Sequence, residues 1–128
     1  MGFPDYFPEG CPPQDAKFMQ IDVYRYTKRN DVLHEEDFRS YHQMGKKFED
    51  PEKHILSFGL SVLSDEAECK NGLLLPKTRK QYGGYARGRV ADVGTAKATP
   101  SKRAPSHHTL WLFVDAKPLE HFVLCNVS

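Results

Sequence analysis

The stretch from Phe58 to Leu63 places the strongest constraint on how this chain can fold. It is short and apolar, reads Phe-Gly-Leu-Ser-Val-Leu, and runs directly into Ser64 and an acidic pair at 65–66. A short apolar run that ends at a hydroxyl and acids is typical of a buried strand leading into a helix. We therefore predict a central strand over residues 58–63 and a helix over 65–71, with Ser64 as the N-cap and the Asn-Gly pair at 71–72 ending the helix.

Several other segments have recognisable periodicity. Apolar residues at helical spacing behind an acidic first turn predict a second helix over residues 35–48, stopped by Pro51. Residues 94–106 are small, polar and basic, and predict a long loop. Four segments have the alternating or continuous apolar pattern of strands; they are residues 20–26, 85–93, 109–114 and 121–127. The last two strands are expected to pair as a hairpin.

The order of these elements indicates the fold class. The prolines and glycines of residues 1–17 predict an extended N-terminal arm. The total of 128 residues suits one globular domain, which we expect over residues 18–128. Both helices fall in the first half and most strands in the second, which favours an α+β fold over alternating βαβ units. We predict a single domain with a mainly antiparallel sheet of about five strands and two helices.

Composition and cysteine usage indicate a cytoplasmic protein without a membrane partner. No apolar run approaches the roughly 18 residues of a membrane-spanning helix, and residues 1–13 lack the charged-then-apolar pattern of an export signal. The three cysteines, Cys11, Cys69 and Cys125, are odd in number and far apart, so we expect reduced thiols. No Cys-x-x-Cys or His-Glu-x-x-His spacing occurs, so we predict no metal site.

Positive charge gathers in one tract. Residues 77–103 contain eight basic side chains and one acid, Asp92, whereas the whole chain carries a net charge of only +1. Such asymmetry favours an anionic ligand, or an acidic patch on another protein. Tyr82 and Tyr85 interleave with these cations, an arrangement that can also bind RNA by phosphate contacts and stacking. The alternative is a solvated basic face with no ligand.

Arg25 and Ser61 are the first candidate site residues. Arg25 shares a strand face with Ile21 and Val23, and a guanidinium that faces the core needs a carboxylate, several carbonyls or an anionic ligand. A structural ion pair is the alternative. The hydroxyl of Ser61 can hold phosphate or ribose oxygens, and Gly59 beside it permits close approach of a ligand. A strand followed by a helix cap would explain the same residues, and no Gly-x-Ser-x-Gly elbow supports a serine hydrolase.

His107 and His108 stand at the mouth of the strand that contains Trp111. Neighbours on a strand point to opposite faces, so the two imidazoles cannot jointly chelate a metal ion unless the backbone bends. One of them could serve as an acid, a base or a phosphate contact near neutral pH. An ordinary histidine at the end of a loop is the alternative.

Short segments spread along the chain resemble a group of short bacterial proteins of unknown function. They are Phe7–Pro13, Val23–Arg25, Glu36–Phe38, Gly59–Val62, Gly88–Val90 and Pro105–Trp111. The chain is also similar to ADP-ribosyltransferase-like folds, in which a strand arginine or histidine, a strand serine and a glutamate bind NAD. Arg25 and Ser61 match the first two positions. The late strands offer only Asp115 and Glu120, both in a turn, for the third.

We therefore expect a small cytoplasmic protein that binds an anionic ligand, such as a nucleotide or phosphorylated group, with transferase-type chemistry if it is an enzyme. The expected catalytic residues are His108 and Arg25. The expected ligand-binding residues are Arg25, Ser61, Arg87, Arg89 and His107. No cofactor is identified by the sequence. The alternative is a non-enzymatic interaction module whose basic face docks an acidic protein or RNA.

Overall fold

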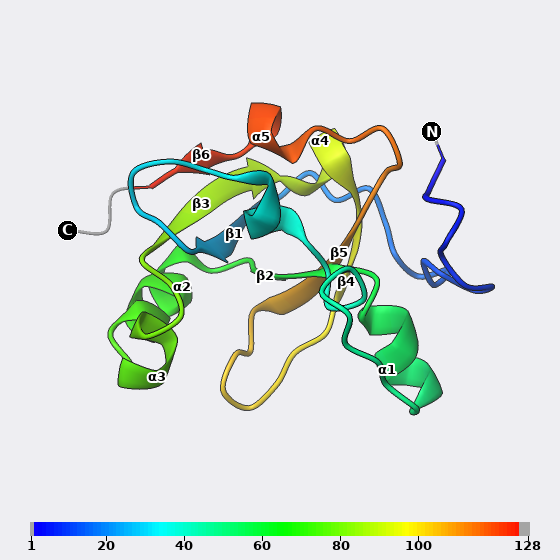
Figure 1. Cartoon of the computed structure of the whole chain (residues 1–128), viewed down its shortest axis with the longest axis horizontal. Coiled ribbons are helices and arrows are strands. Elements are labelled where there is room, and N and C mark those ends of the chain that lie inside the picture. The colour runs from blue at the N-terminus through cyan, green and yellow to red at the C-terminus, as the bar shows by residue number, and fades with distance from the viewer. Residues whose placement is uncertain (1, 126–128) are drawn as a thin grey trace.

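The computed structural model describes residues 2–125, and an open antiparallel sheet of six strands forms its centre (Figure 1). The strand order is β4-β5-β2-β1-β3-β6. The strands are β1 (Asp22–Thr27), β2 (Leu60–Leu63), β3 (Gly84–Arg89), β4 (Gly94–Ala98), β5 (His107–Leu112) and β6 (Val123–Leu124). The helices are α1 (Pro51–Leu56), α2 (Glu66–Leu73), α3 (Pro76–Arg79), α4 (Val90–Val93) and α5 (Pro118–His121), with a 3-10 turn η1 (Glu35–Phe38).

This architecture confirms the predicted α+β class with a mainly antiparallel sheet. The described residues form six strands and five short helices, where about five strands and two helices were expected. None of the helices in residues 2–125 combines the length and the apolar character needed to cross a membrane.

The strand register divides the core between two faces of the sheet, with α4 and α5 on one side and α2 and α3 on the other (Figure 1). We call the first the α5 face; its buried side chains include Val23, Leu60, Val62, Leu110 and Phe122. We call the second the α2 face, where Leu63 and Tyr85 pack against Cys69 and Leu73 of α2. Burial of each large aliphatic side chain contributes about 1.5–3 kcal/mol to folding.

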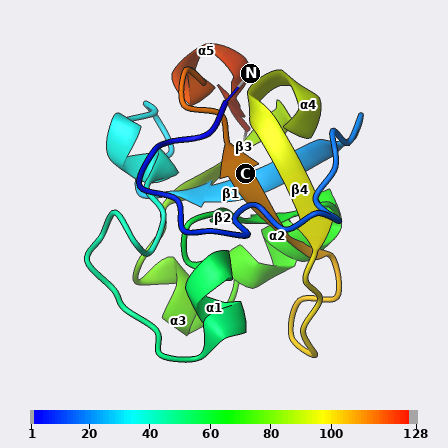
Figure 2. The same cartoon turned by 90° about the vertical axis from the view of Figure 1, so that its right-hand side faces the viewer.

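The N-terminal segment lies along the β4–β5 end of the sheet (Figure 2). Lys17 forms a bridge with Ala96, and the amide of Val114 donates to the carbonyl of Gly2 at 2.9 Å. The ring of Phe3 lies 5.3 Å from that of Phe113, centroid to centroid. These contacts bring the aromatic residues of the segment onto the domain surface.

The predicted helix over residues 35–48 is wrong. Only η1 forms there, because the buried carboxylate of Asp37 accepts hydrogen bonds from the amides of Lys28 and His34, each at 2.9 Å, which ties the segment into a turn. Gly45, with φ of +84°, interrupts the rest of the segment. Pro51 starts helix α1 where a stop was expected, since proline suits the first helical position and Asp50 caps the helix by accepting from the amide of Lys53.

The helix after β2 forms as expected, but its ends differ. Asp65, and not Ser64, is the N-cap, because its Oδ1 accepts from the amides of Ala67 and Glu68 at 2.9 and 3.3 Å. The helix does not end at the Asn-Gly pair but continues to Leu73.

The second half of the chain departs from three further predictions. The expected strand over 85–93 ends at Arg89, where α4 begins. The expected loop over 94–106 begins with strand β4, which pairs with β5 along its full length. The final strand does not form a hairpin with its predecessor: α5 carries the chain across the sheet, and β6 pairs with β3.

Candidate active site

Ser61 on β2 and His107 on β5 form a hydrogen-bonded pair on the α2 face. Ser61 is opposite Thr109 and Leu63 is opposite His107 in the antiparallel register, so Ser61 and His107 are diagonal neighbours. The Oγ atom of Ser61 lies 2.9 Å from Nε2 of His107. The pair is thus assembled by strand register between residues 46 positions apart in the chain.

The other ring nitrogen of His107 determines which way this hydrogen bond runs. Nδ1 lies 3.0 Å from the carbonyl oxygen of Thr99 and 2.8 Å from its Oγ1. A carbonyl can only accept, so Nδ1 carries the proton and Nε2 accepts from the hydroxyl of Ser61. Burial lowers the pKa of His107 below its ordinary value, which favours the neutral ring. The imidazole is therefore poised as a base toward Ser61.

The connection between β4 and β5 holds Thr99 in this position. The amide of Thr99 donates to the carbonyl of His107 at 2.9 Å, and its Oγ1 lies 3.0 Å from Oγ1 of Thr109. At the other end of the connection, the amide of His107 donates to the carbonyl of Ala104 at 3.0 Å. Thr99 thus holds the ring of His107, and the bond to Ala104 holds its main chain.

Two adjoining cavities open onto the pair, and Ser61 and His107 line both of them. The smaller, about 260 Å³, has apolar walls from Tyr41, Phe48 and Leu56. The larger, about 650 Å³, extends over Tyr26 toward α2 and α3. Ser61 is exposed, so its hydroxyl is reachable from either cavity. We call these two cavities together the Ser61 groove.

The side chains that line the Ser61 groove carry a net positive charge. The basic lining residues Lys53, Lys77 and Arg103 are exposed, and none of them takes part in an ion pair within residues 2–125. The two acids of the groove accept hydrogen bonds from neutral groups: Asp65 caps α2, and Glu68 accepts from the hydroxyl of Ser106 at 2.7 Å. Three cations and two carboxylates give the lining of the groove a net charge of +1.

Arg25 lies directly behind Ser61 and is held by main-chain carbonyls. Its Nε donates to the carbonyl of Asp37 at 2.5 Å, Nη1 to that of Ser61 at 2.8 Å, and Nη2 to that of Arg39 at 3.2 Å. β1 and β2 pair only at Tyr24 and Leu63, and the guanidinium occupies the position where they diverge. A carboxylate, several carbonyls or an anionic ligand were expected as partners of Arg25, and the partners in the structure are carbonyls.

Three other predicted site residues lie away from this pair. Arg87 and Arg89 lie on β3, where they are opposite Tyr24 and Asp22 of β1. Strand β1 therefore separates both arginines from β2, and Arg89 forms an ion pair with Asp22 at 3.4 Å. His108 is on the α5 face, opposite Val62, with Nδ1 2.8 Å from the carbonyl of Ser106. The structure therefore brings Arg25, Ser61 and His107 together, and does not bring Arg87, Arg89 or His108 to them.

Two residues of the site were not predicted from the sequence: Lys53, which lines the groove, and Thr99, which contacts the ring of His107. Lys77 and Arg103, which also line the groove, belong to the basic tract of residues 77–103 for which an anionic ligand was expected. Recognising residues 94–98 as a strand paired with β5 would have placed Thr99 next to His107. No comparable signal marks Lys53, since it reaches the groove only through the position of α1. Gly59 is explained by packing, because a Cβ there would lie 2.5 Å from Cγ2 of Thr109.

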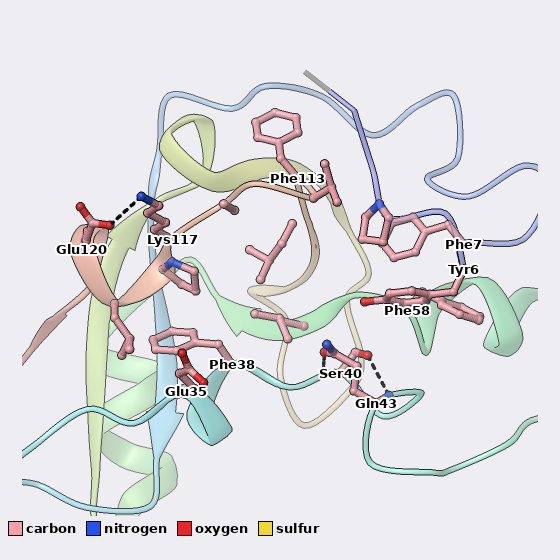
Figure 3. A pocket seen from close by; sticks show the side chains of 17 residues that line it. Tyr6, Phe7, Glu35, Phe38, Ser40, Gln43, Phe58, Phe113, Lys117 and Glu120 are labelled. Atoms are coloured by element: carbon pink, nitrogen blue, oxygen red, sulfur yellow. Dashed lines mark hydrogen bonds and ion pairs between the residues drawn. The ribbon is translucent and has the colours of Figure 1, made fainter.

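A further cavity of about 530 Å³ lies on the α5 face, and aromatic side chains line much of it (Figure 3). Tyr6, Phe7 and Phe58 group on one side, and Lys117 and Glu120 on the other. Leu60 of β2 and Leu112 of β5 also line it. We call this cavity the aromatic pocket.

No protein-family model, curated protein or solved structure that was compared with this chain matches it. Within residues 2–125, no three His, Cys, Asp or Glu side chains gather closely enough to hold a metal ion.

Proposed function

We propose that this protein is a small group-transfer enzyme that binds an anionic ester in the Ser61 groove, with Ser61 as nucleophile and His107 as general base. The observation that carries this proposal is the 2.9 Å contact between Ser61 Oγ and Nε2 of His107. The other ring nitrogen of His107, Nδ1, is held by the carbonyl of Thr99. A nucleophile, its base and a group that orients the base are the three parts of an activated serine.

The proposed reaction has two steps, transfer of the acyl group to Ser61 and its transfer from Ser61 to an acceptor. Ser61 Oγ attacks the carbonyl carbon of the ester while its proton passes to Nε2 of His107. The imidazolium then protonates the departing alkoxide, the alcohol leaves, and the acyl group remains as an ester on Ser61. Water or an acceptor hydroxyl next attacks the same carbon and loses its proton to His107. Ser61 regains that proton as the acyl group departs.

The charge and shape of the groove favour a substrate with a phosphate or carboxylate group. Lys53, Lys77 and Arg103 supply cations without acidic partners, which attract anions by long-range steering and direct contact. The apolar walls of the smaller cavity, from Phe48 and Leu56, suit an acyl chain or a nucleobase. Arg25 is a positioning residue in this proposal, since it bonds the Ser61 carbonyl and not the hydroxyl.

Labelling with a fluorophosphonate tests the nucleophile. The wild-type protein is expected to gain one adduct by intact mass, mapped by peptide sequencing to Ser61. Ser61→Ala and His107→Gln are expected to reduce the labelling rate at least about 100-fold. Ser64→Ala is the matched control and should leave labelling unchanged, because within residues 2–125 Ser64 Oγ hydrogen-bonds only the carbonyl of Ser106. Equal labelling of Ser61→Ala and wild type would overturn the proposal, as would an unlabelled wild type.

Thermal stabilisation by a panel of phosphorylated compounds, including NAD and other nucleotides, tests the anionic substrate. Stabilisation that weakens in Arg103→Ala but not in Arg87→Ala supports the groove, since Arg87 lies outside it. If only RNA binds, with affinity falling steeply as salt rises, the protein is instead an interaction module with a basic face.

A further inference from the structure

The aromatic pocket is separate from the Ser61 groove. Its walls come from four segments far apart in the chain: residues 4–7, 35–43, 58–60 and 112–120. β2 divides the two sites, because Leu60 lines the aromatic pocket on the α5 face while the next residue, Ser61, projects to the α2 face. A volume of about 530 Å³ lies within the usual range of small-molecule sites.

The aromatic wall of the pocket is braced by ring-to-ring contacts. The rings of Phe7 and Phe58 meet edge to face with centroids 5.6 Å apart, and Tyr6 lies 5.6 Å from Phe7 and 6.2 Å from Phe58. The ring of Phe58 is also stacked on that of His42, with centroids 4.1 Å apart. Phe113 joins the wall from the end of β5. These contacts hold the rings in place before any ligand arrives, which reduces the cost of binding.

The polar residues of the pocket leave one uncompensated negative charge. Lys117 lies 3.8 Å from Glu120, so those two charges offset one another. Glu35 also lines the pocket, is exposed, and has no ion-pair partner within residues 2–125. In Figure 3 its carboxylate lies beside Phe38, on the opposite side of the pocket from Tyr6 and Phe7.

We propose that the aromatic pocket binds a small organic cation: an ammonium group attached to an aromatic or branched apolar body. The apolar body packs against Tyr6, Phe7 and Phe58, and the ammonium lies at the end formed by Glu35 and Phe38. A cation over an aromatic face is attracted by the ring quadrupole, and the carboxylate adds a charge-assisted hydrogen bond. An anion of the same shape would meet both the carboxylate and the negative ring faces.

Three probes of similar size and different charge test this proposal: 2-phenylethylammonium, 2-phenylethanol and phenylacetate. Calorimetric titration of the full chain is expected to give the tightest binding for the ammonium, weaker binding for the alcohol and none for the carboxylate. Glu35→Gln should weaken ammonium binding about tenfold and leave the alcohol unchanged. Tyr6→Ala, at a residue that is 49% exposed, should weaken both.

Two control variants separate this site from its surroundings. Glu36→Gln removes a neighbouring charge that pairs with Lys28 and does not line the pocket, so ammonium binding should be unchanged. Ser61→Ala should also leave ammonium binding intact, because that residue lies on the other face of the sheet. Phenylacetate binding as tight as that of the ammonium would overturn the proposal. So would unchanged ammonium affinity in Glu35→Gln, or no detectable binding of any probe.

Discussion

The Nη1 atom of Arg25 donates a 2.8 Å hydrogen bond to the carbonyl oxygen of Ser61 at the point where β1 and β2 stop pairing. If the register from Tyr24 and Leu63 continued, Ser61 would be opposite Tyr26. The guanidinium instead links β2 to the segment around Asp37 and Arg39. One side chain therefore fixes the backbone of the proposed nucleophile.

Replacing Arg25 with methionine is expected to destabilise the fold by about 2–4 kcal/mol, since three main-chain carbonyls lose a charged donor. The free energy of unfolding from urea titrations measures this loss. Arg39→Met is the matched control: the Arg39 side chain is exposed, and its removal should cost no more than about 0.5 kcal/mol. Equal losses in the two variants would contradict a bracing role for Arg25.

Sequence periodicity was informative where strands are regular. The alternation around Val23 and the apolar run at 58–63 correctly placed β1 and β2, because side-chain pattern alone determines which strand face is buried. The pattern failed at residues 35–48, where the buried carboxylate of Asp37 bonds two amides and overrides the helical spacing. It also failed at β4, since a strand of small residues has little apolar signal of its own and depends on pairing with β5.

The candidate site was partly accessible from sequence for the same reason. Strand alternation indicated that His107 and His108 face opposite ways, which they do, but could not say which of them faces Ser61. That choice depends on the register between β2 and β5, and a shift of one residue would have exchanged the two histidines. Two cations of the groove, Lys77 and Arg103, belong to the basic tract that the sequence indicated. Their position beside Ser61, like that of Lys53, depends on helix packing and loop path.

The stability of the protein should depend on pH through His107. Burial lowers the pKa of His107 in the folded state, whereas in the unfolded chain it is about 6.5. Between the lowered value and about 6.5 the unfolded chain binds more protons, so the free energy of unfolding rises with pH across that interval. The contribution of His107 is complete above about pH 6.5 and is lost as pH falls through the folded-state pKa.

Urea titrations at several pH values measure this dependence. His107→Gln should reduce the rise in stability, while His121→Gln, at an exposed residue, should retain the wild-type slope. A wild-type slope in His107→Gln would show that its ring is not buried in the neutral form.

Gly72 of α2 is required by the approach of Tyr26. A Cβ at Gly72 would lie 2.0 Å from the Tyr26 hydroxyl, which donates to the carbonyl of Cys69 at 3.0 Å. Gly72→Ala should therefore cost about 1–3 kcal/mol despite the better helix propensity of alanine. In a Tyr26→Phe background the same change should cost much less, because the clashing oxygen is gone. A double-mutant cycle by thermal denaturation measures the coupling, and additive effects would contradict it.

The cysteines of the folded protein should react slowly with alkylating reagents. Burial raises the pKa of both Cys11 and Cys69 to about 12, and that of Cys125 above its ordinary value. Because the thiolate is the reactive form, Cys11 and Cys69 at pH 8 should react roughly 1,000-fold more slowly than an unperturbed thiol. Time-resolved iodoacetamide labelling with peptide mapping resolves the three sites, and all three should react quickly in urea. Rapid native labelling of Cys11 would show that the N-terminal segment detaches from α1, since its thiol contacts the Ile55 carbonyl at 3.8 Å.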